Sequence, residues 1–230
     1  MTETAKPKKK KKILKHNTKF ENKSLKISSR RYLERQVRDQ WSEKARKEGY
    51  RSRAVYKISY IDDKHNLFRI GRKVVDLGAA PGGWSQYAAR KLGGKAAIIA
   101  MDKLEMETIS NVTFIQGDFN DDDVFEHLLT LCPEGVDVVM SDLAPETTGV
   151  ANLDHLRSIQ LCEMALDFAL RTLRPGGDFV CKVFMGGEEK KLMESLRQYF
   201  EKSKFEKPDA SRAESKEIFI VATGFKAADS

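Results

Sequence analysis

Apolar residues occur along this chain in two patterns, as short runs and as stretches in which they return every three to four positions. The runs are mostly bounded by Gly, Pro, Asn or Asp, and they predict strands at 73–77, 96–101, 112–116, 136–141, 178–184 and 217–223. A further strand is predicted near 204–207. The three-to-four spacing predicts helices at 30–47, 52–66, 84–92, 122–131, 153–173 and 188–200. Strands and helices therefore alternate from residue 72 onward.

Buried strands separated by helices of this length imply a parallel sheet that is covered by helices on both faces. We therefore predict an α/β fold with a doubly wound, seven-stranded, mostly parallel sheet and a basic helical N-terminal extension. Residues 1–27 show no periodicity and are predicted to form a disordered, Lys-rich arm. The rest, 28–230, is predicted to be one domain, with N-terminal helices at 28–66 and a catalytic core at 67–226.

Charge is distributed unevenly along the chain. Residues 1–57 hold 20 Lys and Arg against 6 Asp and Glu, whereas residues 58–230 hold 21 against 28. The first quarter is therefore strongly basic and the remainder mildly acidic. Basic arms of this kind commonly contact nucleic acid phosphates and release counterions. A solubility tail without a partner is the alternative interpretation.

Several classes of protein are disfavoured by composition. Three cysteines, Cys132, Cys162 and Cys181, show no C-x-x-C spacing and are expected to be small buried residues in a reducing compartment. The four histidines form no metal pattern with them, so no metal site is expected. No apolar run approaches the roughly 18–20 residues of a membrane helix, and no apolar segment follows the first lysines. A cytoplasmic protein without a membrane partner is expected.

A Gly-rich turn at residues 76–84, Asp-Leu-Gly-Ala-Ala-Pro-Gly-Gly-Trp, joins the first core strand to the next helix. Glycines at this place let a ligand approach the backbone closely. The turn lacks both G-x-G-x-x-G and the Lys-Ser/Thr pair of a P-loop. It suits S-adenosylmethionine, which carries no phosphate, better than it suits a dinucleotide or a nucleoside triphosphate.

Three acidic residues end successive strands beyond this turn. Asp102 is placed to accept hydrogen bonds from both ribose hydroxyls of a cofactor, and Asp118 to meet its adenine amino group. Asp142 ends the fourth strand. Each aspartate alone is more often a helix cap or a turn residue. Three of them in register with a Gly-rich turn favour a cofactor site.

Five segments, 52–57, 76–85, 141–145, 181–184 and 211–217, together resemble the FtsJ/RrmJ family of Rossmann-like RNA ribose 2′-O-methyltransferases. The resemblance covers about residues 28–226. The chain length and the sequence of residues 82–87 are most similar to those of the bacterial branch, which methylates a uridine in the A-loop of large-subunit (23S) ribosomal RNA. The resemblance thus implies S-adenosylmethionine as cofactor and RNA as partner, in an assembled or assembling ribosomal subunit. We expect a monomer.

The resemblance also implies roles for individual residues. The family's catalytic tetrad corresponds to Lys57, Asp142, Lys182 and Glu217. Its cofactor contacts correspond to Gly82, Trp84, Asp102, Asp118 and Asp142. Two features depart from the family pattern: the Lys-rich arm, and Glu146, which stands where an uncharged polar residue is expected.

Methyl transfer from a sulfonium is an in-line displacement, so alignment of the acceptor contributes most, about 7–11 kcal/mol, and a general base adds roughly 10²–10⁴-fold. Lys182 is the candidate base. Because lysine is mostly protonated at neutral pH, this role requires surroundings that favour the neutral amine. Burial and the cation of Lys57 favour it, whereas Asp142 and Glu217 oppose it. The alternative is that Lys182 orients the hydroxyl as a cation.

Other functions share some of these features. A 2′-O-methyltransferase that acts on tRNA or on capped RNA would use the same tetrad. A non-catalytic RNA-binding factor in ribosome assembly would keep the fold but would not need the tetrad. A nicotinamide-dependent dehydrogenase would need the missing glycine pattern. Attack on a pyrimidine carbon needs a cysteine, and strand alternation should point Cys181 away from Lys182.

Overall fold

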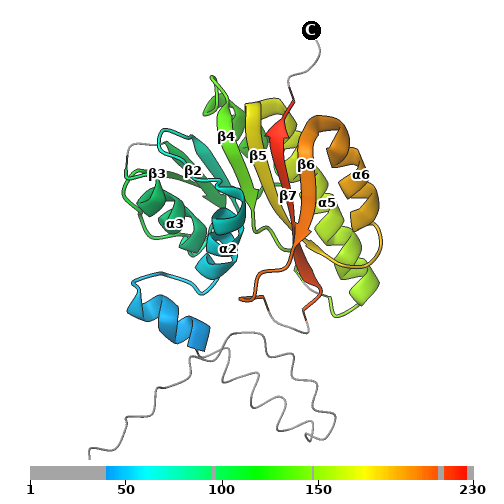
Figure 1. Ribbon diagram of the computed structural model, residues 1–230, viewed down its shortest axis with the longest axis horizontal. Helices are drawn as coiled ribbons and strands as arrows, with labels where there is room; N and C mark the ends of the chain where they lie inside the picture. Colours follow the sequence, from blue (N-terminus) through cyan, green and yellow to red (C-terminus); the bar gives the residue numbers. More distant parts are fainter. Residues whose placement is uncertain (1–39, 95–96, 147, 212–214, 227–230) are drawn as a thin grey trace, which may run out of the picture. The chain divides into compact units, whose positions relative to one another are not determined.

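A seven-stranded sheet organises the residues that this computed structural model describes, which are 40–94, 97–146, 148–211 and 215–226 (Figure 1). The strands are β1 Val74–Leu77, β2 Ile98–Asp102, β3 Val112–Gln116, β4 Val136–Ser141, β5 Leu173–Phe184, β6 Phe200–Glu206 and β7 Glu217–Phe225. The helices are α2 Val55–His65, α3 Gly83–Lys91, α4 Asp122–Thr130, α5 Ala151–Thr172 and α6 Glu189–Tyr199, and residues 40–47 are also helical.

The strand order is β3-β2-β1-β4-β5-β7-β6. Strands β3 to β5 pair in parallel, and β7 runs antiparallel to both of its neighbours. The predicted doubly wound, mostly parallel α/β sheet is therefore confirmed. The chain crosses from β1 to β2 on one side and later to β4 on the other, so the carboxyl ends of these strands border the crevice where ligands of such sheets bind.

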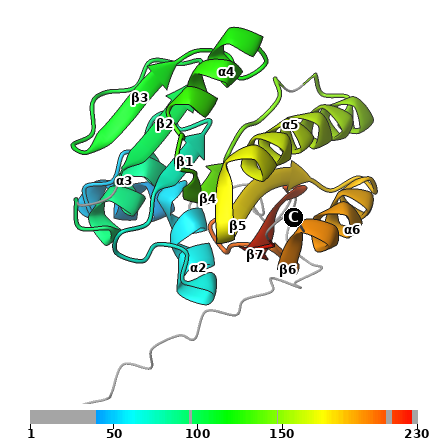
Figure 2. The same cartoon turned by 90° about the horizontal axis from the view of Figure 1, so that it is seen from above.

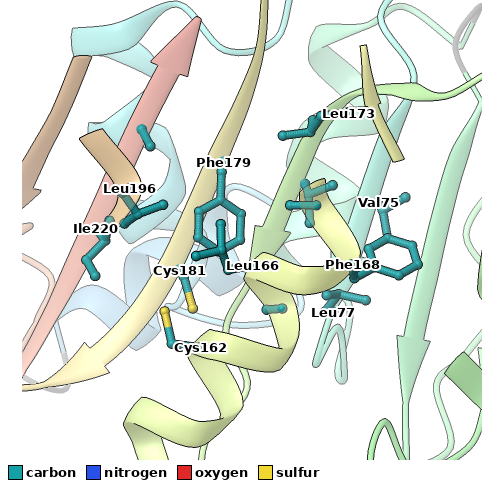
Figure 3. Packing of buried hydrophobic residues seen from close by; sticks show 14 of the residues in the cluster. Val75, Leu77, Cys162, Leu166, Phe168, Leu173, Phe179, Cys181, Leu196 and Ile220 are labelled. Atoms are coloured by element: carbon teal, nitrogen blue, oxygen red, sulfur yellow. The ribbon is translucent and has the colours of Figure 1, made fainter. Parts of the chain in front are cut away.

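Helices cover both faces of the sheet (Figure 2), and each face has its own apolar cluster. Helices α4, α5 and α6 pack on one face; Phe168 of α5 lies near Val75 and Leu77 there (Figure 3). Helices α2 and α3 pack on the other face. All four residues of β1 are buried, as expected of a strand covered on both sides. This central strand therefore gives the Gly-rich turn a rigid base.

Two strands begin four or five residues before their predicted starts, whereas most other boundaries differ by three residues or fewer. The Arg-Pro-Gly-Gly segment at 174–177 was expected to separate α5 from a strand at 178–184, but β5 begins at Leu173. Leu173 pairs with Val136 and Asp178 with Val138, so the four residues between form a bulge within one strand. Strand β6 begins at Phe200 rather than at 204, directly after α6.

Some predictions concern residues outside the described ranges. The arm at 1–27 lies outside them, and so does the first part of the helix predicted at 30–47, of which residues 40–47 are described and helical. The three cysteines are buried, as predicted. Among the described residues, no helix is both long and apolar enough to cross a membrane.

Candidate active site

The turn after β1 favours glycine at two positions, because both have a positive φ and both lie close to neighbouring atoms. Gly78 has a φ of +77°, and a Cβ there would lie 2.9 Å from the backbone nitrogen of Leu143. Gly82 has a φ of +102°, and a Cβ there would lie 2.8 Å from both Ile109 and Met106. Gly82 also caps α3. The turn is therefore held between the segment after β4 and the segment after β2.

Asp76, in β1 at the start of this turn, is a buried carboxylate with an unsatisfied oxygen. Its Oδ2 accepts a hydrogen bond of 2.6 Å from Ser85 Oγ, whereas its buried Oδ1 has no partner. Burial raises the pKa of Asp76 to about 7, and the nearby carboxylates of Asp142 and Asp102 add to this. Three carboxylates thus lie close together beside the turn, an arrangement that favours a cationic ligand.

Two of the predicted cofactor residues also hold local turns. Asp102 accepts hydrogen bonds from the backbone nitrogens of Ala80 (2.9 Å) and Leu104 (2.8 Å). Asp118 Oδ1 accepts from both nitrogens of Asn120, and these bonds lower the pKa of Asp118. A carboxylate oxygen can accept more than one hydrogen bond, so both residues keep acceptor capacity. The turn role and the cofactor role are therefore compatible.

Trp84 contributes its side chain to the core rather than to the crevice. The residue is 3% exposed; its indole donates a hydrogen bond of 2.9 Å to the carbonyl of Ala54, and its ring centroid lies 5.7 Å from that of Phe219. Only the backbone of Trp84, in the first turn of α3, remains for a cofactor. The first N–H groups of a helix have no intrahelical acceptor, so they suit a polar ligand group.

The four residues of the candidate tetrad form two ion pairs. Lys182 Nζ lies 2.8 Å from Asp142 Oδ1 and donates a hydrogen bond of 2.5 Å to the Asp142 carbonyl. Lys57 Nζ donates a hydrogen bond of 2.8 Å to Glu217 Oε2. All four side chains are at least 80% buried. They come from α2, the end of β4, β5 and the start of β7.

Strand register places the two ion pairs on the same face of the sheet. Lys182 pairs with Phe219 in the antiparallel β5–β7 ladder, and Glu217 lies two residues before Phe219. Lys182 and Glu217 are therefore diagonal neighbours on one face. Cys181 lies on the opposite face, where its sulfur points toward Cys162 of α5 (Figure 3). The prediction that Cys181 faces away from Lys182 is confirmed.

Two further side chains hold Glu217, and their roles could not be read from the sequence pattern. Ser211 Oγ donates a hydrogen bond of 2.7 Å to Glu217 Oε1. Lys207 Nζ donates to the carbonyls of Ser215 (2.5 Å) and Glu217 (2.6 Å). Burial lowers the pKa of Lys207, and the cation of Lys57 acts in the same direction. Ser211 belongs to a motif that the resemblance identifies, but nothing in the residues around Lys207 distinguishes it from a surface lysine.

Glu146, the residue that departs from the family pattern, has a partner of its own. Its Oε1 accepts a hydrogen bond of 2.9 Å from Lys103 Nζ, and both side chains are exposed. Lys103 follows β2 and Glu146 follows β4, while β1 lies between these two strands. This surface ion pair therefore links the two segments that flank the Gly-rich turn.

Arg51 lies in the strongly basic first quarter of the chain, and its side chain forms hydrogen bonds within the protein. Its guanidinium donates hydrogen bonds to the carbonyls of Glu107 (2.6 Å), Thr108 (2.8 Å) and Pro81 (3.4 Å). It therefore connects the segment before α2 to the Gly-rich turn and to the loop after β2.

Comparison with known proteins identifies the family. The sequence model of the family described as FtsJ-like methyltransferase matches residues 50–225. A protein of Granulibacter bethesdensis named ribosomal RNA large subunit methyltransferase E is 48% identical over 200 residues, which cover 87% of this chain and 86% of that protein. A protein of the same name from a Psychrobacter species is 48% identical over 207 residues, covering 90% and 99%.

A solved structure agrees with this match. The crystal structure of a protein described as a ribosomal RNA methyltransferase from Plasmodium falciparum superposes with a TM-score of 0.70 at 29% identity. The superposition covers 78% of this chain and all of that one. Sequence and fold thus lead to one conclusion: the chain belongs to the FtsJ-like methyltransferase family.

Proposed function

We propose that this protein uses S-adenosylmethionine to methylate the ribose 2′-hydroxyl of a uridine in the A-loop of large-subunit ribosomal RNA. The observation that carries the proposal is the placement of two buried ion pairs, Lys182–Asp142 and Lys57–Glu217, on one face of the sheet. Asp142 connects the two ion pairs with the Gly-rich turn, because its negative charge helps to raise the pKa of Asp76 at the start of that turn. The names of the relatives support large-subunit rRNA as the substrate.

The residues beside the turn fit S-adenosylmethionine. Asp76, Asp102 and Asp142 form a group of neighbouring carboxylates, and one oxygen of the buried Asp76 is unsatisfied. S-adenosylmethionine carries a sulfonium and an ammonium beside one carboxylate, so its net positive charge complements this group. Asp102 would bind the ribose hydroxyls and Asp118 the adenine amino group, while Asp142 and the backbone at Gly82 and Trp84 would complete the site. The cofactor supplies an electrophilic methyl group.

The chain's own task is to align the 2′-hydroxyl and to accept its proton. Lys182 Nζ would take that proton, which requires a neutral amine when the substrate binds. Asp142 and its carbonyl restrain Nζ. The Lys57–Glu217 pair, held by Ser211, would fix the hydroxyl from the neighbouring strand. Two adjacent restrained groups provide the alignment from which most of the rate gain arises.

The substrate is expected to be an assembled or assembling ribosomal subunit, which the protein binds as a monomer in the cytoplasm. The test is incubation of the full chain with methyl-labelled S-adenosylmethionine and separate pools of tRNA, free rRNA and large ribosomal subunits lacking the modification. Digestion to nucleosides should give labelled 2′-O-methyluridine from the large-subunit pool.

Label that appears mainly in tRNA or in capped RNA would show that the protein acts on another RNA substrate. Label on a base rather than on ribose would contradict the assigned chemistry. No label in any pool would favour a non-catalytic role in ribosome assembly.

A further inference from the structure

His155 is a buried histidine of α5 whose two ring nitrogens have different partners. The residue is 2% exposed; its Nδ1 lies 2.7 Å from the carbonyl oxygen of Phe184, and its Nε2 lies 3.3 Å from the backbone nitrogen of Glu188. A carbonyl oxygen only accepts a hydrogen bond, and a backbone N–H only donates one. Nδ1 therefore donates to Phe184, while Nε2 faces the backbone N–H of Glu188 and, at 4.0 Å, the carboxylate of Glu189.

The ring packs tightly against the loop that joins β5 to α6. A Cβ added to Gly186 would lie 2.3 Å from Cγ of His155, so only glycine fits beside the ring. Glu189 accepts hydrogen bonds from the backbone nitrogens of Gly186 (3.0 Å) and Gly187 (2.6 Å). This loop is therefore held by His155 from α5 and by Glu189 from α6.

Ser158, one turn further along α5, completes the grip on the end of β5. Its Oγ accepts a hydrogen bond of 3.1 Å from the backbone nitrogen of Phe184 and donates one of 2.8 Å to the carbonyl of His155. Both backbone polar groups of Phe184 are thus bound by α5. Phe184 lies two residues after Lys182 and is in register with Glu217.

The residue before His155 holds a second loop. Asp154 accepts hydrogen bonds from the backbone nitrogen and the hydroxyl of Thr148 (2.7 and 2.8 Å) and from the nitrogen of Gly149 (3.2 Å). Thr148 and Gly149 lie in the β4–α5 connection, which begins at Asp142. Two consecutive residues of α5 thus bind the segments that follow the Lys182–Asp142 ion pair. Asp154 binds the loop after Asp142, and His155 binds the end of β5 after Lys182.

We propose that His155 is a positioning residue for methyl transfer. Its Nδ1–H bond to Phe184 keeps the end of β5 in place, so that Lys182 Nζ stays against Asp142. The proposal rests on the proposed function, because it assigns a kinetic consequence to the placement of Lys182. His155 acts through the Phe184 backbone. A misplacement of a reacting group by about 1 Å can cost roughly 10²-fold in rate.

Three substitutions separate the two ring contacts. His155→Asn puts an amide N–H near the place of Nδ1 and keeps a donor for Phe184, whereas His155→Gln puts its amide near the place of Nε2. His155→Leu removes both hydrogen bonds. His127→Leu, at an exposed histidine of α4, is the matched control. The assay measures kcat and KM on whichever RNA pool the wild type methylates, together with cofactor Kd and thermal unfolding.

His155→Leu and His155→Gln should lower kcat by about 10- to 100-fold, while KM for RNA and cofactor Kd stay within about twofold. His155→Asn should recover most of the lost rate, and the control should match the wild type. The proposal is overturned if Asn and Gln variants have equal kcat, or if the losses lie only in KM. If the Leu variant does not fold, the comparison of Asn with Gln decides.

A wild type that methylates no RNA pool contradicts the proposed function itself, and with it any role of His155 in the reaction. An active wild type whose His155 variants keep full kcat contradicts only the role of His155. The two failures are therefore distinguishable within one experiment.

Discussion

Lys182 and Glu217 are diagonal neighbours on one face of the antiparallel β5–β7 ladder, although they lie 35 residues apart in the sequence. Each is bound by an oppositely charged residue from another element, Asp142 after β4 and Lys57 on α2. The antiparallel strand β7 brings the second pair to the first. The candidate tetrad therefore depends on β7, which runs antiparallel to the other strands of the described sheet.

The first prediction concerns the buried Lys57–Glu217 pair. Lys57→Met or Glu217→Gln alone leaves a buried group without its partner, and such losses typically cost about 3–5 kcal/mol of stability. The double variant Lys57→Met/Glu217→Gln should be more stable than the less stable of the two single variants. Denaturant unfolding of the three proteins measures this double-mutant cycle. Additive losses would show that the pair contributes no coupling.

The second prediction is a pH dependence that arises from Asp76. Its folded-state pKa is raised to about 7, whereas an unfolded aspartate titrates near 3.9. Between these pH values the folded state holds a proton that the unfolded state lacks. The free energy of unfolding therefore falls as pH rises from about 4 to about 7. Asp76→Asn should therefore stabilise the cofactor-free protein at pH 8, by on the order of 3–4 kcal/mol at most.

The measurement is urea unfolding of the cofactor-free protein at several pH values between 5 and 8. Asp63→Asn, at an exposed residue of α2, is the control and should follow the wild type. The assignment of this pH dependence to Asp76 is wrong if Asp76→Asn keeps the wild-type slope. Cofactor affinity should change in the opposite sense, because an ionised Asp76 attracts a cationic ligand and its replacement by Asn removes that attraction.

A core role of Trp84 and a cofactor-binding role predict different effects of substitution. Because the indole lies in the core and binds the Ala54 carbonyl, Trp84→Phe should cost about 1–3 kcal/mol of stability and leave cofactor Kd within about twofold. Asp102→Asn should instead raise the cofactor Kd by about tenfold or more, because a hydrogen bond to a charged group contributes about 1.5–3 kcal/mol. Isothermal titration gives both dissociation constants. A large loss of affinity in Trp84→Phe would mean that the indole contacts the cofactor.

Most of the sheet could be predicted from the sequence because every strand except the polar β6 contains a local apolar run. The positions of β3 and β4 agree residue for residue with the predicted ranges. The bulge at 174–177 was missed because it depends on pairing with β4, which is about 40 residues away. From the local sequence alone, a Pro-Gly-Gly segment indicates a turn or loop rather than the interior of a strand.

Residues of the candidate site could be predicted only where they belong to a recognisable sequence motif or end a predicted strand. The tetrad and the aspartates at strand ends were predicted from the family resemblance and from strand order. The unsatisfied oxygen of Asp76 and the contacts of Lys207 depend on packing, which local patterns do not contain. His155 was missed for the same reason, since its partners lie 29 and 33 residues away. A histidine in a helical stretch gives no local signal of such contacts.

The most direct test of the account is the single-turnover rate at which Lys182→Ala forms 2′-O-methyluridine at saturating cofactor and RNA. Lys190→Ala, at an exposed lysine of α6, is the matched control. The predicted result, in Lys182→Ala protein that is shown to be folded and saturated with cofactor, is a loss of about 10²-fold or more, with the control at the wild-type rate. A folded, cofactor-binding Lys182→Ala protein that methylates ribose at near the wild-type rate would contradict the central claim.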